Sequence, residues 1–395
     1  MLSAIGAATA VANPVVYWNE VTMQAMTAGR PGPPGLLDAA IVHAAMHDAV
    51  QAIEGDYEPY FFSDPSAAGV GSADAAAVAA AYGTLVRLYP GQLSILYAKY
   101  AAYIAGHGLD GDPGLAVGEA AAAALHANHS RPAVPMTPFY GYEETGQWRS
   151  ATPMAFLYAT TVEPFTLLDN SQFRPAPPPP LNSGAYLRDY DEVTELGAST
   201  AHPSERTDIA RFWSGNFPTQ WNEALRGIAD AQLLDVGEAA RLFAIANLAA
   251  SDAFLAVWEC KRHYNLWRPS TAIREGDFDG DPKTIGNPQW NGFIPDPPYP
   301  DYVSGANGLT GAFTGILQLY FGGDELEFTV KNMNPLVVDK EREYTRISDA
   351  AQEVVDARVW LGIHFRFADT AGRELGSRVA RWAFMRYLRP VPGAQ

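Results

Sequence analysis

Apolar residues recur along most of this chain with the spacing of helix faces rather than with the alternation of strands. Positions i, i+3, i+4 and i+7 place apolar side chains on one side of a helix. Many of these stretches are rich in alanine, which favours helix, and Gly and Pro separate them. The predicted helices cover residues 15–27, 36–54, 73–89, 93–106, 114–128, 185–196, 203–214, 219–233, 236–261, 348–367 and 370–387. The pattern therefore predicts an all-α protein.

The helical pattern is interrupted between residues 132 and 182, where prolines, aromatic residues and turn residues dominate. An irregular connection of this length inside a globular protein is unusual and often has a functional or bridging role. We predict an N-terminal helical bundle over 14–131, a connecting segment over 132–182 and a C-terminal helical bundle over 183–395. Aromatic residues such as Trp148 and Phe165 need burial, so the connecting segment is expected to pack on the body.

The first thirteen residues are small and apolar without a basic start, so they could be the remnant of a secretory signal. If they are such a remnant, a periplasmic or secreted location is expected. If they are simply a frayed chain start, a cytoplasmic location is expected. No window reaches eighteen uninterrupted apolar residues, which predicts no membrane span. The formal charge of −17 argues against nucleic-acid partners and anionic membrane surfaces. Apolar helical faces leave a homodimer open.

Lys261 and Arg268 follow a long apolar stretch, residues 237–258, that is typical of a buried helix. If that helix continues, the two cations lie two turns apart on one face, and Pro269 ends the helix. Two cations beside Trp258 and Trp267 are costly to bury unless an anion lies between them. The alternative is a pair of surface cations whose apolar stems lie along the body.

Two further elements complete a candidate oxyanion site. Ser304 and Gly305 open a run of small and apolar residues, and a helix start offers N–H groups and a hydroxyl to an oxyanion. Glycines 305, 308, 311 and 315 would let another helix approach closely. Arg358 and His364 are six residues apart, so they share a pocket only if their helix bends or ends near Gly362.

Lys-x6-Arg-Pro, followed by Ser-Gly and then Arg-x5-His, resembles the signature of the vanadium-dependent haloperoxidases and the related type 2 phosphatidic acid phosphatases. The resemblance to the bacterial haloperoxidase branch extends to residues 37–48, 172–181, 205–215, 264–274 and 362–376. It implies two packed helical bundles of the vanadium chloroperoxidase and acid phosphatase type.

The resemblance also implies a role for each motif residue. The residues that would bind vanadate, or phosphate in its place, are Lys261, Arg268, Ser304, Gly305, Arg358 and His364. His364 would be the ligand of the vanadium atom, or the nucleophile in a phosphatase. Lys261 would polarise bound hydrogen peroxide, which oxidises a halide or a small organic substrate. Vanadate and phosphate have nearly the same shape and charge, so one set of charge-assisted donors serves both.

The sequence departs from the family pattern at one position. Family members usually carry a histidine after Ser-Gly as the acid–base group, but this chain has Ala306, followed by Asn307. Alanine transfers no proton, and Asn307 can hydrogen-bond but cannot protonate a leaving group. Asn307 therefore joins Lys261 and His364 as a candidate catalytic residue, with His263 as another candidate proton carrier. We expect bromide or iodide to be oxidised rather than chloride.

Two other functions stay open at this point. One is a soluble phosphatase with a phosphorylated His364 intermediate. The other is a non-redox isomerase or cyclase, or a homologue that only binds an anion.

Two further patterns have simpler interpretations than metal binding. His43 and His47 have the i, i+4 spacing of zinc ligands, but no third ligand is evident, which favours core and capping roles. The acidic run at 277–282 lacks the glutamate of a calcium loop and is predicted to be a plain acidic loop.

Overall fold

The computed structural model describes residues 13–129, 136–200 and 204–393. The predicted signal remnant therefore lies outside the described residues, apart from Asn13, whose side chain caps the first helix. The fold is all-α, as predicted, with one small antiparallel hairpin. The helices of the first half are α1 (Pro14–Gly29), α2 (Gly35–Glu54), α3 (Ala73–Leu88), α4 (Leu93–His107) and α5 (Gly114–His129).

The second half contains the remaining long helices and the hairpin. Its helices are α6 (Gly184–Leu196), α7 (Ser204–Phe212), α8 (Phe217–Ala231), α9 (Val236–Tyr264), α10 (Pro269–Arg274), α11 (Gly305–Tyr320), α12 (Ile347–Trp360) and α13 (Arg366–Arg386). The hairpin pairs β1 (Glu325–Lys331) with β2 (Glu341–Arg346). Alternate β1 side chains are buried, so the period-two pattern of Leu326, Phe328 and Val330 was a strand signal that the helical prediction missed.

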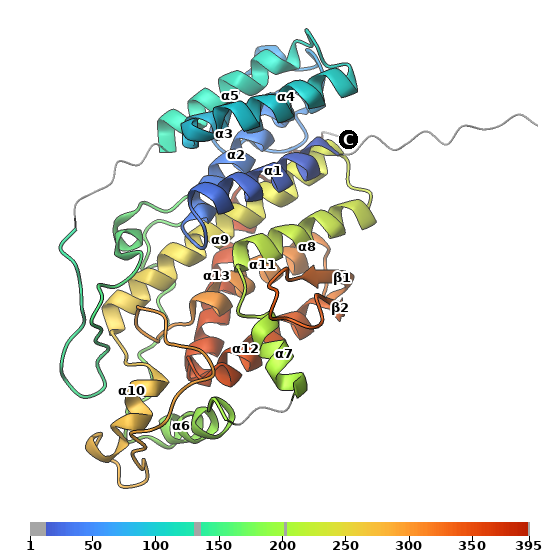
Figure 1. Ribbon diagram of the computed structural model, residues 1–395. Coiled ribbons are helices and arrows are strands. Elements are labelled where there is room, and N and C mark those ends of the chain that lie inside the picture. Colours follow the sequence, from blue (N-terminus) through green and yellow to red (C-terminus); the bar gives the residue numbers. More distant parts are fainter. Residues whose placement is uncertain (1–12, 130–135, 201–203, 394–395) are drawn as a thin grey trace, which may run out of the picture.

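Helix α9 is the central element of the molecule (Figure 1). A capping box of Asp235 and Glu238 fixes its start, because each side chain binds the backbone N–H of the other residue. It packs against α2 on one side and against α11 and α13 on the other. Its length and composition would suffice to cross a membrane, but its most apolar window is entirely buried inside the protein. The predicted boundaries between the two bundles stay predictions, since α9 contacts both sets of helices.

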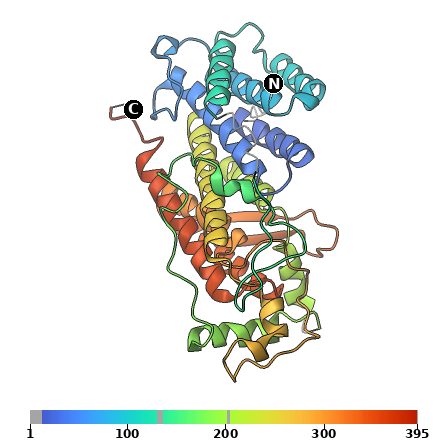
Figure 2. The same ribbon diagram turned by 90° about the vertical axis from the view of Figure 1, so that its left-hand side faces the viewer.

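Helices α11 and α13 lie unusually close together because glycines line their interface. A Cβ at Gly311 would collide with the carbonyl oxygen of Arg373, and one at Gly376 with that of Gly308. The predicted close approach along the glycine face of α11 is thus confirmed. Figure 2 shows α13 running beside α9, and the two helices are in contact.

The connecting segment is fixed to the body, as its aromatic residues predict. Trp148 and Phe165 are buried, and a short 3-10 helix covers Leu157–Thr161. Asp252, a buried carboxylate on α9, accepts hydrogen bonds from the backbone N–H groups of residues 165–167. Residues 130–135 lie outside the described part, so the start of this segment is not covered.

His43, His47 and the acidic loop make hydrogen bonds within the protein. The Nε2 atom of His43 contacts the amide of Asn19, and that of His47 contacts the carbonyl of Glu58. In the acidic loop, Asp277 and Asp281 accept hydrogen bonds from backbone N–H groups of the loop itself. Across the described ranges, no three His, Cys, Asp or Glu side chains are grouped to hold a metal ion.

Candidate functional site

Lys261 and Arg268 converge, but not by the route that the sequence pattern predicts. Helix α9 ends at Tyr264, where Asn265 adopts the left-handed conformation with φ 49°. Pro269 begins α10 rather than ending α9, because a proline fits the first turn of a helix, where its missing N–H costs nothing. The prediction of one continuous helix through Arg268 is therefore wrong. A tight turn at Asn265 returns Arg268 to the end of α9 instead.

Lys261 is a fully buried cation at the end of α9. Its Nζ donates to the carbonyl oxygens of Pro300 at 2.7 Å and Asp301 at 2.9 Å. An ammonium has three N–H donors, so one remains for a ligand. Burial, followed by repulsion from Arg268, lowers its pKa well below the usual value. A nearby anion would oppose this lowering, because it favours the charged form of the lysine.

Arg268 holds two chain segments together. Its Nε donates to the carbonyl of Tyr299 at 2.9 Å, and its Nη1 donates to that of Ile363 at 2.6 Å. The side chain is 1% exposed, yet its Nη2 has no hydrogen-bond partner in the described part of the chain. A buried guanidinium N–H without a partner is costly, and an oxyanion is the ligand that best matches it.

Arg358 and His364 share the pocket because α12 ends between them, as their spacing requires. The helix stops at Trp360, and Gly362 has φ 73°. A Cβ at Gly362 would collide with the carbonyl of Gly197, so only glycine fits this turn. The predicted helix over 348–367 is accordingly two elements, and the turn brings His364 back toward Arg358.

Arg358 is buried at the end of α12. Its Nη1 donates to the carbonyl of Trp213 at 2.9 Å, whereas its Nε finds no partner among the described residues. Burial lowers its pKa, and the charge of Arg268 lowers it further. Lys261, Arg268 and Arg358, called the cation cluster below, therefore carry positive charge that their own surroundings do not fully compensate.

His364 faces the cation cluster as a neutral imidazole. Burial and then the charges of Arg268 and Lys261 lower its pKa well below the usual value. Its Nδ1 lies 2.6 Å from Oδ1 of Asp301, and its Nε2 lies 3.3 Å from Nη1 of Arg268. When Asp301 is ionised, it accepts the Nδ1–H proton, and Nε2 is then an acceptor that faces Nη1 of Arg268.

Asp301 is a site residue that the sequence reasoning missed. It is fully buried between His364 and Arg268, and its Oδ1 lies 3.6 Å from Nη1 of Arg268. Burial raises its pKa to about 7, although Arg268 and Lys261 oppose the rise. An acidic residue three positions before Ser304 was the available signal, but nothing in the sequence says which histidine it meets.

Ser304 and Gly305 lie at the start of α11, as predicted. Ser304 is the N-cap residue and is fully buried. Gly305 is the first helical residue, and the first N–H groups of a helix have no partner within the helix. A Cβ at Gly305 would lie 3.3 Å from the ring of Trp258, a tight contact that favours the absence of a side chain. This end of α11 can therefore offer N–H donors to an anion.

The two candidate replacements for the missing histidine lie in different places. Asn307 is fully buried, and its Nδ2 donates to Oδ1 of Asp369 at 2.8 Å and approaches Oγ of Ser304 at 3.4 Å. His263 is exposed and packs against Tyr264. Asn307 thus belongs to the site, and His263 does not. Asp369, a second buried carboxyl, was also missed by the sequence reasoning.

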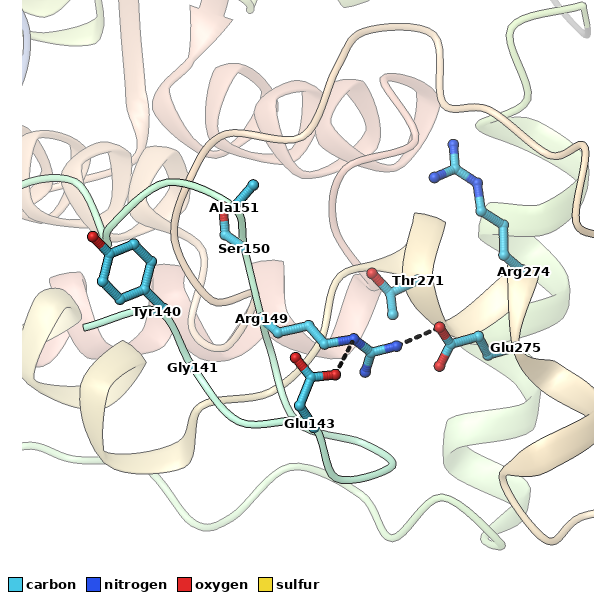
Figure 3. A pocket seen from close by; sticks show the side chains of 9 residues that line it. All are labelled: Tyr140, Gly141, Glu143, Arg149, Ser150, Ala151, Thr271, Arg274 and Glu275. Carbon is cyan, nitrogen blue, oxygen red and sulfur yellow. Dashed lines mark hydrogen bonds and ion pairs between the residues drawn. The ribbon is translucent and has the colours of Figure 1, made fainter. Parts of the chain in front are cut away.

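A surface hollow is lined by α10, which follows Arg268 directly, but it does not contain the cation cluster. The hollow has a volume of about 470 Å³ and is lined by Thr271 and Arg274 of α10 and by residues of the connecting segment. Figure 3 shows Arg149 crossing it between Glu143 and Glu275, with which it forms ion pairs. None of the cation cluster lines it, so the hollow is separate from the buried cations.

Comparison with known proteins agrees with this arrangement. Residues 241–393 match the family described as VCPO second helical-bundle domain, and that range includes the cation cluster and His364. The vanadium chloroperoxidase of Curvularia inaequalis is 28% identical over 266 residues, covering 51% of this chain and 44% of that enzyme. The match thus spans less than half the length of that relative.

Solved structures of the same kind share the fold over nearly the whole chain. A bacterial vanadium-dependent iodoperoxidase superposes with a TM-score of 0.79 at 20% identity, covering 96% of this chain and 97% of that one. The holo form of a bacterial vanadium-dependent chloroperoxidase gives 0.73 at 20% identity, covering 92% and 94%. The resemblance drawn from the sequence motifs, and the helical-bundle fold that it implies, are confirmed.

Proposed function

We propose that this chain, which has the fold of the vanadium-dependent haloperoxidases, is a haloperoxidase-type enzyme that oxidises bromide or iodide with hydrogen peroxide at a vanadate held by His364. The observation that carries the proposal is the cation cluster around a neutral imidazole. Three buried cations and Nε2 of His364 converge from α9, the turn before α10, and the two ends of the α12–α13 connection.

The residues present fit an oxyanion. Within the described residues, Nη2 of Arg268 and Nε of Arg358 are buried donors without a partner. Lys261 retains one N–H, and Gly305 offers a helix N-terminal N–H. Buried donors that lack partners are expensive, so a group that satisfies several of them at once stabilises the site. A tetrahedral oxyanion does this, and His364 adds a ligand for its central atom.

Vanadate, when bound, supplies a Lewis acid that activates hydrogen peroxide without a change in its own oxidation state. The side chains of this protein do the remaining work. The cation cluster neutralises negative charge, and Lys261 places an N–H beside the reacting oxygens. Asp301 holds the imidazole of His364 in one tautomer and one orientation. Burial of every member excludes water and strengthens each of these interactions.

The experiment that tests the proposal is bromide and iodide oxidation with hydrogen peroxide, before and after the purified protein is loaded with vanadate. We expect turnover to require vanadate and to vanish in His364→Ala. The exposed His263→Ala is the matched control and is expected to keep full turnover. Vanadate binding without any halide oxidation would reject the peroxidase proposal and leave an anion-binding protein.

A phosphatase is the second candidate, and the Asp301–His364 pair is the observation that favours it. A carboxylate that fixes Nδ1–H makes Nε2 a better nucleophile toward phosphorus. Hydrolysis of nitrophenyl phosphate by the unloaded protein, with inhibition by vanadate, would support this function. The two candidates respond to vanadate in opposite ways, so a single titration separates them.

A further inference from the structure

Arg358 is the least tightly held member of the cation cluster. Lys261 and Arg268 each donate to two backbone carbonyl oxygens. The Arg358 side chain has one hydrogen bond within the described ranges, from Nη1 to the carbonyl oxygen of Trp213 at 2.9 Å. An arginine side chain has several rotatable bonds, so one bond to a fixed acceptor decides where its other donors point. The direction of the Arg358 guanidinium therefore depends on where the Trp213 carbonyl is held.

The Trp213 carbonyl is available because of where α7 ends. Trp213 is the first residue after α7, and its N–H still donates to the carbonyl of Ile209 at 3.0 Å. The last carbonyl groups of a helix have no partner within the helix and carry the negative end of its dipole. Arg358 thus binds the end of a helix, where a cation is favoured.

The ring of Trp213 is also fixed. The side chain is fully buried in an aromatic stack, with its ring centroid 5.9 Å from that of Phe217 and 6.0 Å from that of Trp221. Its Nε1 donates to Oε1 of Glu353 at 2.7 Å. Glu353 and Arg358 both belong to α12, where five positions span about 7.5 Å along the helix axis. Helix α12 therefore holds Trp213 at both ends, at the indole by Glu353 and at the carbonyl by Arg358.

Glu353 is itself held by the hairpin. Its Oε1 accepts from Nε of Arg342 at 2.6 Å and from the hydroxyl of Tyr344 at 2.7 Å. Its Oε2 accepts from Nη2 of Arg342 at 2.5 Å. Both partners lie on β2, which contacts α12 (Figure 1). A carboxylate that binds an arginine through both oxygens keeps one orientation, so the hairpin gives Glu353 a fixed position from which it holds the indole.

We infer that Glu353 is a positioning residue for the anion site: it holds the Trp213 indole, so that the Trp213 carbonyl aims the guanidinium of Arg358 at the bound oxyanion. The inference rests on the proposed function, since it assigns a supporting role toward the same site. Glu353 acts through two hydrogen bonds, and both end at Arg358 rather than at another cation. Loss of the indole bond should therefore weaken only the contribution of Arg358 to anion binding.

A purely structural role for the indole bond is the alternative, and Trp221 is the matched case for it. Trp221 lies in the same aromatic stack, is fully buried and donates from Nε1 to Oγ1 of Thr310 at 3.2 Å. It lies inside α8, so its carbonyl is used by the helix itself. Removal of either indole N–H should lower stability, but only removal from Trp213 should also weaken anion binding.

The first test measures the affinity for inorganic phosphate by calorimetric titration, with the melting temperature without phosphate recorded separately. Trp213→Phe keeps an aromatic ring and the backbone carbonyl but removes the donor to Glu353. We expect its phosphate affinity to fall by at least about fivefold, within the usual coupling between contacting residues. Trp221→Phe should lower the melting temperature and bind phosphate as the unchanged chain does. Equal affinity of the two variants would overturn the inference, because the indole bond would then serve stability alone.

The second test asks whether the effect passes through Arg358. In an Arg358→Met background, Trp213→Phe should change phosphate affinity by less than about twofold, because no guanidinium remains to be aimed. The same fivefold loss in both backgrounds would contradict the inference, since Trp213 would then act on another part of the site.

The third test asks whether the effect begins at Glu353. Glu353→Met should weaken phosphate binding, and Trp213→Phe added to it should weaken binding by less than about twofold more. Glu353→Gln keeps an acceptor for the indole and should bind phosphate more tightly than Glu353→Met. Additive losses would assign the two residues separate tasks and overturn the inference. If Glu353→Met does not melt cooperatively, the comparison of Trp213→Phe with Trp221→Phe decides.

Failure of the inference is distinguishable from failure of the proposed function. If phosphate does not bind the unchanged chain, or binds Arg358→Met equally well, the anion site is wrong and the positioning role with it. If phosphate binds and Trp213→Phe behaves like Trp221→Phe, only the positioning role is wrong. If the phosphate results are as expected and the vanadate-loaded protein oxidises no halide, the positioning role stands and the peroxidase proposal is rejected.

Discussion

Two buried polar clusters on the same helix behave in opposite ways. Asn247, in the middle of α9, joins Asn19 of α1 and Asn222 of α8 in an asparagine cluster, and each amide nitrogen and oxygen of the three side chains has a partner. At the end of α9, the cation cluster leaves donors of Arg268 and Arg358 without partners in the described chain. A fully satisfied neutral cluster stabilises a fold, whereas an unsatisfied charged cluster is the mark of a binding site.

Two buried histidines show the same contrast. His43 contacts the asparagine cluster through the amide of Asn19, and burial lowers its pKa to about 3. His364 instead has a carboxylate at Nδ1 and the cation cluster around it. Burial lowers the pKa of both imidazoles, but the charge near His43 is that of Arg226 alone among the described residues, whereas His364 has a carboxylate on one side and the cation cluster on the other. The difference teaches that burial alone does not identify a functional histidine, and that the charge of its neighbours does.

The largest effect should follow removal of one cation. We expect Lys261→Met to weaken vanadate binding by roughly 10²–10³-fold, since truncating a buried charge partner costs about 2–5 kcal/mol. The melting temperature without an anion should not fall, because the variant removes a buried charge that lacks full compensation. The exposed Lys283→Met is the control and should change neither quantity. Unaltered affinity in Lys261→Met would place the anion elsewhere.

Removal of one amide from the asparagine cluster should lower the stability of the fold and leave vanadate binding intact. We expect Asn247→Leu to lower the free energy of unfolding by about 2–4 kcal/mol, because it leaves one buried N–H of Asn222 without a partner and removes one of the two hydrogen bonds to Asn222 Oδ1. Vanadate affinity should stay within about twofold. Chemical denaturation measures the first quantity and anion-dependent melting the second. Gln24→Leu, an exposed amide on α1, controls for loss of an amide as such.

A smaller effect should follow loss of the carboxylate that orients His364. We expect Asp301→Asn to reduce vanadate-dependent turnover or vanadate affinity by about 10–100-fold, the usual effect of removing a partner of a metal-binding histidine. Turnover of the unchanged chain should also decline as pH falls below about 7, because protonation of Asp301 ends its acceptance from Nδ1–H. An unchanged pH profile in the variant would mean that another group controls the decline.

The last prediction concerns the pH dependence of stability at His43. Its folded pKa of about 3 lies below the unfolded value of 6.5, so its neutral form contributes stability above pH 6.5 that is lost as pH falls toward 3. The unfolding free energy of the unchanged chain, minus that of His43→Gln, should decrease by about 1.4 kcal/mol per pH unit in that window. If the unfolding free energy of both proteins changed equally with pH, protonation of His43 would not destabilise the fold.

Much of the site could be predicted from the sequence, and the omissions have a common cause. The cation cluster, Ser304, Gly305 and His364 are motif residues at fixed spacings, so a resemblance finds them. Asp301 and Asp369 carry no spacing signal, because their roles depend on contacts with residues more than sixty positions away. Long-range contacts of this kind are set by packing and leave no local pattern.

The fold, like the site, was predicted from the sequence only where the signals are local. Helical periodicity and its Gly and Pro boundaries determined the all-α class and the extent of most helices, because these signals act within one or two turns. The tertiary structure decided where the helix ends near the site: the turn at Asn265 and the left-handed Gly362 place Arg268 and His364 against Lys261. The spacing of Arg358 and His364 required a break near Gly362, but it did not specify the turn at Asn265 or the direction of either turn, because these depend on the segments that pack around them. The sequence alone thus determined which side chains form the site, and tertiary packing decided how they meet and which carboxyls join them.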